Sequence, residues 1–88
     1  MIAPTPGLGD LLARVPPGWS RQTVGDELWG VSRVEHAGGR STTVTATQLG
    51  GPASFSANVW HIAEGDVLRP CEVPEECVLR FLRELPPR

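Results

Sequence analysis

The sequence contains no lysine, and its eight basic side chains are all arginines, set against ten acidic residues. The formal net charge of −2 leaves the protein without the broad positive field that supplies most non-specific affinity for nucleic acid. A lysine-free chain that is rich in alanine, glycine, proline and arginine is typical of a GC-rich bacterial genome. We therefore expect a bacterial protein for which nucleic acid is not the favoured partner.

Long apolar runs are also missing, because no segment approaches the ~20 apolar residues that a membrane-spanning helix needs. The N-terminal stretch has no basic residue before its short apolar run, and its first arginine is Arg14, so it makes a poor signal peptide. We expect a cytoplasmic protein in which the two cysteines, Cys71 and Cys77, are reduced thiols.

Few residues are suited to chemistry. His36 and His61 fall in separate predicted strands and match no metal-ligand spacing, and the glycine pairs in "AGGR" and "LGGP" suit turns rather than phosphate binding. The predicted strand pairing places His61 near the edge of the apolar sheet face, where Cys71 could approach it. Cys71 and His61 form the one cysteine–histidine nucleophilic pair that can be assembled, and no third, orienting residue is identified for it. We expect no metal, no cofactor and no catalysis, with a cysteine-dependent enzyme as the third functional alternative.

The length of 88 residues predicts one small domain, residues 1–88, with an ordered body of about 8–85 between proline-rich ends. A helix is expected within "GLGDLLARV", where Leu8, Leu11, Leu12 and Val15 share one side and Pro16 ends the segment. A second helix is expected to begin at Pro74, with acidic residues in its first turn. Its predicted apolar stripe is Cys77, Val78, Phe81, Leu82 and Leu85.

Between the helices the pattern is typical of strands at 27–36, 41–49 and 54–62, separated by short glycine-rich turns. Residues 67–70 indicate a possible fourth strand, and whether 19–24 forms a strand is left open. The prediction is an α+β fold with two layers: an antiparallel three- to four-stranded meander sheet, with an N-terminal and a C-terminal helix packed on one face (order α-β-β-β-(β)-α).

The register follows if both turns are two residues long. A turn at Gly38-Gly39 pairs Val31 with Ala46, and a turn at Gly51-Pro52 pairs Ala46 with Ala57. Both assumptions place the same apolar residues on one face, which is expected to meet the helices. This face comprises Trp29, Val31, Val44, Ala46, Phe55, Ala57 and Val59.

The opposite face combines small hydroxyl residues with a tryptophan. A one-sided sheet commonly exposes serine and threonine to water, and the N-terminal segment could cover Trp60. However, Trp60 with its predicted neighbours Thr43 and Val34, and the pair Leu28 and Leu49, resemble an interaction patch. We expect a non-catalytic binding or assembly module that binds another protein or a second copy of itself. The predicted partner-binding residues are Thr43, Thr45, Ser56, Asn58 and Trp60.

The alternative function is that of a small nucleic-acid-associated regulatory protein. The order helix, three strands, helix resembles that of double-stranded-RNA-binding domains, and Arg21, Arg33 and Arg40 could form a small basic patch. Where those domains carry a basic stretch at the start of the last helix, this chain has the acidic "PEECVLR".

Overall fold

Five antiparallel strands form a single sheet in which neighbours in the chain are neighbours in space. The computed structural model describes residues 4–87, so residues 1–3 and 88 of the predicted domain lie outside the described residues. The strands are β1 (Gly18–Val24), β2 (Glu27–His36), β3 (Ser41–Gln48), β4 (Ser54–Ile62) and β5 (Gly65–Cys71).

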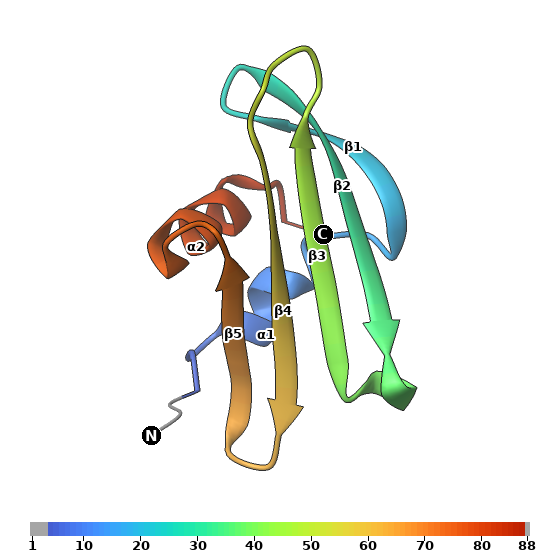
Figure 1. Ribbon diagram of the computed structural model, residues 1–88, viewed down its shortest axis with the longest axis vertical. Helices are drawn as coiled ribbons and strands as arrows, with labels where there is room; N and C mark the ends of the chain where they lie inside the picture. The colour runs from blue at the N-terminus through green and yellow to red at the C-terminus, as the bar shows by residue number, and fades with distance from the viewer. Residues whose placement is uncertain (1–3, 88) are drawn as a thin grey trace.

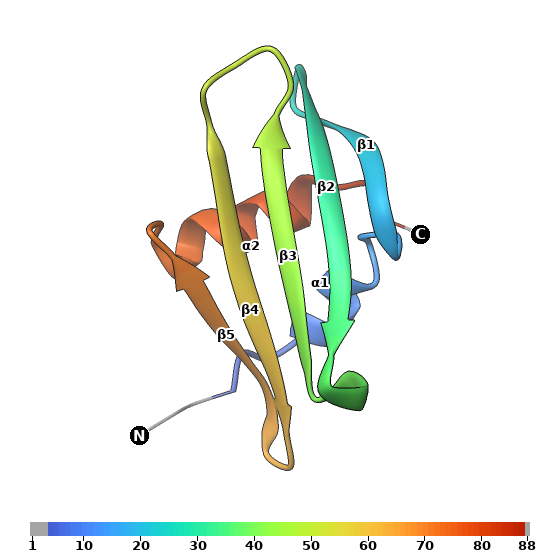
Figure 2. The ribbon, with the colours of Figure 1, turned by 45° about the vertical axis from the view of Figure 1, so that its right-hand side comes forward.

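The two helices, α1 (Leu8–Leu12) and α2 (Glu75–Glu84), pack on the same side of this sheet (Figures 1 and 2). The predicted two-layer α+β fold is thus confirmed, with five strands rather than three or four. The edge strand β5 is the possible fourth strand of the prediction, and the edge strand β1, which the sequence left open, is the fifth. In β1 only Val24 is buried, so its sequence lacks the apolar alternation that marks the central strands.

The register between β2 and β3 agrees with the prediction, because Val31 pairs with Ala46. The connection is longer than expected: a 3-10 turn at Ala37–Gly39 precedes Arg40. The loop therefore contains two more residues than the predicted turn, one taken from the end of each strand, so the residue pairs between the strands are unchanged.

The predicted register between β3 and β4 is wrong by two residues. Ala46 pairs with Phe55 instead of Ala57, because a five-residue loop joins the two strands. The backbone N–H of Gln48 closes this loop by donating to the carbonyl of Ala53 at 2.8 Å. Side chains alternate with a period of two, so a slip of two residues keeps every side chain on its predicted face.

All seven residues of the predicted apolar face contact the core. Trp29 and Phe55 are partly buried against it, and the other five are fully buried. Phe81 of α2 packs edge-on against both aromatic rings, with ring centroids 5.0 Å from each. The remaining core side chains come from α1 and its flanks, β1, β5, and α2 with the residue that follows it: Leu8, Leu12, Val15, Val24, Leu68, Val78, Leu79, Leu82 and Leu85.

The predicted stripe of α2 needs one correction, since Cys77 is exposed and Leu79 is buried instead. At about 100° per residue, the stripe centred near Val78 and Leu82 places Leu79 roughly 80° from its midline and Cys77 roughly 120° away. The burial that the pattern assigned to Cys77 therefore belongs to Leu79.

Candidate functional site

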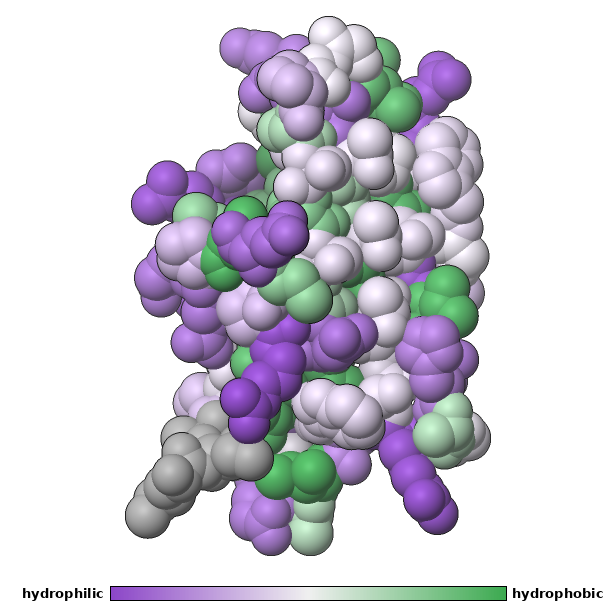
Figure 3. Space-filling view, viewed as in Figure 1, coloured by the Kyte–Doolittle hydropathy of each residue, from purple (hydrophilic) through white to green (hydrophobic). Residues whose placement is uncertain are grey.

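The face of the sheet opposite the helices is open to solvent and is built in straight rows across the strands. One row crosses all five strands and presents Trp19, Ser32, Thr45, Ser56 and Cys71. Space-filling representation shows the small polar side chains as a pale band along the middle of this face (Figure 3). We refer to the outward-facing side chains of the five strands as the open face.

The structure brings four of the five predicted partner-binding residues together at the centre of the open face. Thr45 lies opposite Ser56 and Thr43 opposite Asn58, and the Thr43 hydroxyl donates to Asn58 Oδ1 at 2.7 Å. The fifth residue, Trp60, lies on the same face but opposite Ser41. Its predicted cross-strand neighbour Thr43 is therefore wrong, as a result of the two-residue slip.

Trp60 is 47% exposed, so the described part of the N-terminal segment, from residue 4 onward, does not cover it. Together with Ile62, Val67 and Arg69 it lines a mainly apolar depression of about 340 Å³ at one end of the open face. Val67, its partner on β5, is buried although it lies outside the core cluster. This end of the open face is therefore an apolar contact surface with an arginine at its rim.

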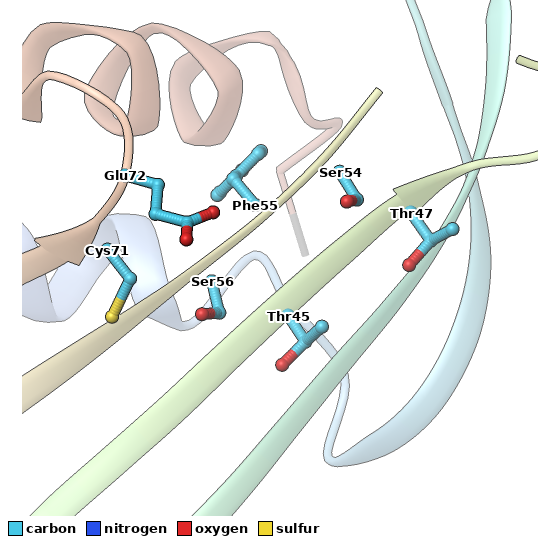
Figure 4. Close-up of a pocket in the computed structure, with 7 residues that line it drawn as sticks. All are labelled: Thr45, Thr47, Ser54, Phe55, Ser56, Cys71 and Glu72. Atoms are coloured by element: carbon cyan, nitrogen blue, oxygen red, sulfur yellow. The ribbon is translucent and has the colours of Figure 1, made fainter. Parts of the chain in front are cut away.

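A second depression, of about 320 Å³, lies at the other end of β4 and β5 and is lined by polar and apolar atoms in about equal measure. Hydroxyl groups from β3 and β4 and the thiol of Cys71 lie along it, and Glu72 reaches it from the loop after β5 (Figure 4). The lining residues are Thr45, Thr47, Ser54, Phe55, Ser56, Cys71 and Glu72.

Trp19 belongs to the open face but was not predicted as a site residue. It is 63% exposed, and its indole lies over Gly30 of β2 so closely that a Cβ on Gly30 would come 2.9 Å from Trp19 Nε1. A glycine within a strand often marks such a close approach, and Gly30 was the available signal. The absence of a side chain on Gly30 therefore lets the indole lie directly against the backbone of β2.

The charged strand side chains of the open face have one sign, and the Glu72 carboxylate reaches its margin from the loop after β5. Among the strand residues, Arg21 and Arg69 are the charged side chains that point outward, and no strand carboxylate points that way. The predicted patch of Arg21, Arg33 and Arg40 does not form on one surface, because Arg33 points to the helix side, where its Nη1 donates to the carbonyl of Leu12 at 2.9 Å.

The helix side of the sheet carries a polar relay at its margin. His61 Nδ1 lies 2.7 Å from Asp66 Oδ1, and His61 Nε2 lies 2.8 Å from Thr42 Oγ1. Thr42 is 3% exposed, whereas the side chains of His61 and Asp66 are 31% and 26% exposed. These three residues, from three neighbouring strands, were not predicted as a site, although His61 was placed near the edge of the core face.

Neither cysteine takes part in this relay. Cys71 lies opposite Ser56 on the open face and His61 lies on the helix side, so the Cys71–His61 pair of the third functional alternative does not form. Both cysteines are exposed free thiols. Within residues 4–87, no cluster of three or more histidine, cysteine, aspartate or glutamate side chains could hold a metal ion.

Comparison of the chain with models of protein families, with curated proteins and with solved structures finds no match. Within the described part of the chain, neither helix has the length and apolar character that crossing a membrane requires.

Proposed function

We propose that the protein is a binding module that holds a partner protein, either a different chain or a second copy of itself, against the open face of its sheet. The observation that carries this proposal is the distribution of exposed apolar side chains. The large exposed hydrophobic residues of the described chain all lie on the open face or continue it: Trp19, Leu28, Val34, Leu49, Trp60 and Ile62. Such one-sided grouping is typical of interaction surfaces.

The size of the face supports the same function. Five strands about 4.8 Å apart, each about eight residues long at ~3.3 Å per residue, outline roughly 600 Å². This area approaches the ~800 Å² per partner of a standard protein interface. The centre offers hydroxyl groups for hydrogen bonds, and the tryptophans near two margins offer the aromatic contacts that carry most binding energy at interfaces. Bacterial origin and a cytoplasmic location remain predictions.

The test uses the double variant Trp60→Ala with Thr45→Glu, which removes the aromatic contact and puts a carboxylate at the centre of the face. Sedimentation velocity at micromolar concentration and affinity purification from native lysate are compared with the unaltered protein. We expect the associated species to be lost. Arg80→Glu, on the exposed side of α2, is the control and should keep it. Association unchanged in the folded double variant would refute the proposal.

The charge of the open face favours a second candidate, a single-stranded nucleic acid. Exposed tryptophans beside arginines, with no strand carboxylate, resemble the stacking platforms that bind unpaired bases. The net charge of −2 opposes this candidate. Quenching of tryptophan fluorescence by a mixed-sequence oligonucleotide at low salt, lost in Trp60→Ala and weakened by added salt, would favour it over a protein partner.

A further inference from the structure

The direction of the hydrogen bonds in the polar relay follows from the chemistry of its members. An ionised carboxylate only accepts hydrogen bonds, so Asp66 requires the proton of a neutral His61 to sit on Nδ1. The Nε2 atom then has a free lone pair, and the Thr42 hydroxyl must donate to it across 2.8 Å. Hydroxyl, imidazole and carboxylate are thus arranged as a nucleophile, a general base and a positioning acid group.

The adjacent residue provides an internal contrast. Thr43 also bonds to a histidine, since its Oγ1 lies 2.9 Å from His36 Nε2 on the open face. However, the Thr43 hydroxyl gives its proton to Asn58 Oδ1, so His36 must be the donor in that pair. Neighbouring threonines therefore contact the two histidines with opposite polarity, and only the pair of Thr42 with His61 also bonds to a carboxylate.

The relay opens into a cavity of about 180 Å³ between α1 and the sheet, lined by Gly9, Leu12, Ala13, Arg33, Glu35, Thr42, His61 and Asp66. This volume admits a small acyl group. Arg33 is held at the wall through its bond to the carbonyl of Leu12, and further N–H groups of the guanidinium remain for a negative oxygen. Gly9 brings α1 close to the relay, because a Cβ there would lie 3.4 Å from Asp66 Oδ2.

We propose that Thr42 is the nucleophile of an acyl-transfer site that accepts small activated esters. Thr42 Oγ1 forms a bond to the acyl carbon while its proton passes to His61 Nε2, and the carbonyl electron pair moves onto the oxygen beside Arg33. Collapse of this intermediate breaks the bond to the leaving group, which departs with the proton from His61 Nε2, and leaves an acyl-threonine and a neutral His61. Water then attacks the ester after giving a proton to Nε2, and Thr42 Oγ1 recovers the proton as the acid departs. Asp66 positions His61 throughout.

The test uses p-nitrophenyl acetate, with both thiols first blocked by N-ethylmaleimide. Because the chain has no lysine, few competing nucleophiles remain, and peptide mass spectrometry can map the acetyl group. We expect acetylation at Thr42 and release of p-nitrophenol about a hundredfold faster than in Thr42→Val or His61→Gln. Thr42→Ser, which keeps the hydroxyl, should retain release, and Asp66→Asn should lower it. His36→Gln, on the other histidine, is the matched control and should leave it unchanged.

Release by the unaltered protein that is no faster than by a folded His61→Gln variant would overturn the proposal. So would an acetyl group found only away from Thr42. His61 is partly solvated, so its substitution is expected to preserve the fold even if Thr42→Val does not. The site lies on the opposite side of the sheet from the open face, so this result is independent of the test of partner binding.

Discussion

At the scale of single residues, the contact between Trp19 and Gly30 decides how an exposed aromatic ring is presented. Trp19 lies on an edge strand, where a free indole would sample several rotamers and lose entropy on binding. Because Gly30 has no side chain, the indole of Trp19 packs directly against its backbone, and Gly30 is buried beneath the ring. The open face thus holds one of its two exposed tryptophans in place before any partner arrives.

Gly30→Ala should displace the indole of Trp19 without unfolding the protein. The Gly30 backbone does not require a positive φ, so alanine fits the strand, but the added Cβ would overlap the ring and push it towards solvent. We expect the indole N–H signal of Trp19 to move in a ¹⁵N-correlated NMR spectrum, while that of the core residue Trp29 stays in place. Identical Trp19 signals in both proteins would show that the ring does not rest on Gly30.

At the scale of elements, α1 is too short to be stable alone, because an isolated helix needs about 12–15 residues to be even marginal. Besides its buried leucines, two arginines that follow it in the chain hold it in place. Arg33 of β2 donates to the carbonyl of Leu12, and Arg14 donates from Nη1 to the carbonyls of Arg83 and Leu85 at 2.8 and 3.1 Å. The two helices are therefore joined at their C-terminal ends.

Arg14→Met should lower the free energy of unfolding by about 1–2 kcal/mol, because it keeps most of the apolar stem and removes charge-assisted bonds to carbonyls at the end of α2. Urea titration followed by circular dichroism measures the change. Arg83→Met is the matched control on the exposed side of the same turn and should change stability by less than about 0.5 kcal/mol. Equal losses of unfolding free energy in both variants would contradict the role of the Arg14 hydrogen bonds in joining the two helices.

Phe81 is the residue through which α2 packs on the sheet, since it contacts the rings of Trp29 and Phe55 together. Phe81→Ala should cost about 3–5 kcal/mol through lost burial and the cavity that remains. The loss is measured by urea unfolding, with Arg80→Ala on the exposed side of the helix as the control. A loss below about 1.5 kcal/mol would mean that the aromatic cluster is loosely packed.

The elements that could be predicted from the sequence are those in which periodicity and burial coincide. Alternation in β2, β3 and β4 assigned the core residues of these three strands to the correct face. The predicted loop after Gln48 was too short, but the resulting register error is two residues, and an even error leaves each side chain on its face. The edge strand β1 could not be assigned from the sequence, because it pairs on one side only and has polar residues on both faces, so it shows little hydrophobic alternation.

The polar relay could not be predicted for a different reason. His61 was placed near the margin of the core face, and Thr42 alternates onto the same face, but Asp66 stands at the start of a strand whose existence was uncertain. Three strands must be in correct register before the three side chains meet. Likewise, the contact of Trp19 with Gly30 depends on pairing between β1 and β2, which the sequence left open.

At the scale of the whole molecule, the sheet separates two surfaces with different properties. The open face carries exposed apolar and hydroxyl side chains with two outward arginines, whereas both helices and the relay lie behind it. A single core connects α1, all five strands and α2. Substitutions on the open face are therefore expected to alter binding without altering the cavity beside Thr42, and their effects on stability should add to those behind the sheet.

This shared core predicts that the protein unfolds as one cooperative unit. Tryptophan fluorescence includes the signal of Trp29 in the aromatic cluster, and far-ultraviolet circular dichroism reports on the backbone. In urea the two transitions should coincide, with a slope near 1 kcal/mol/M, as expected for a small domain. The double variant Trp60→Ala with Thr45→Glu should keep this slope, because neither side chain belongs to the core. Separate transitions would show that α1 or an edge strand detaches before the rest, and a changed slope would show that the open face contributes to the compactness of the fold.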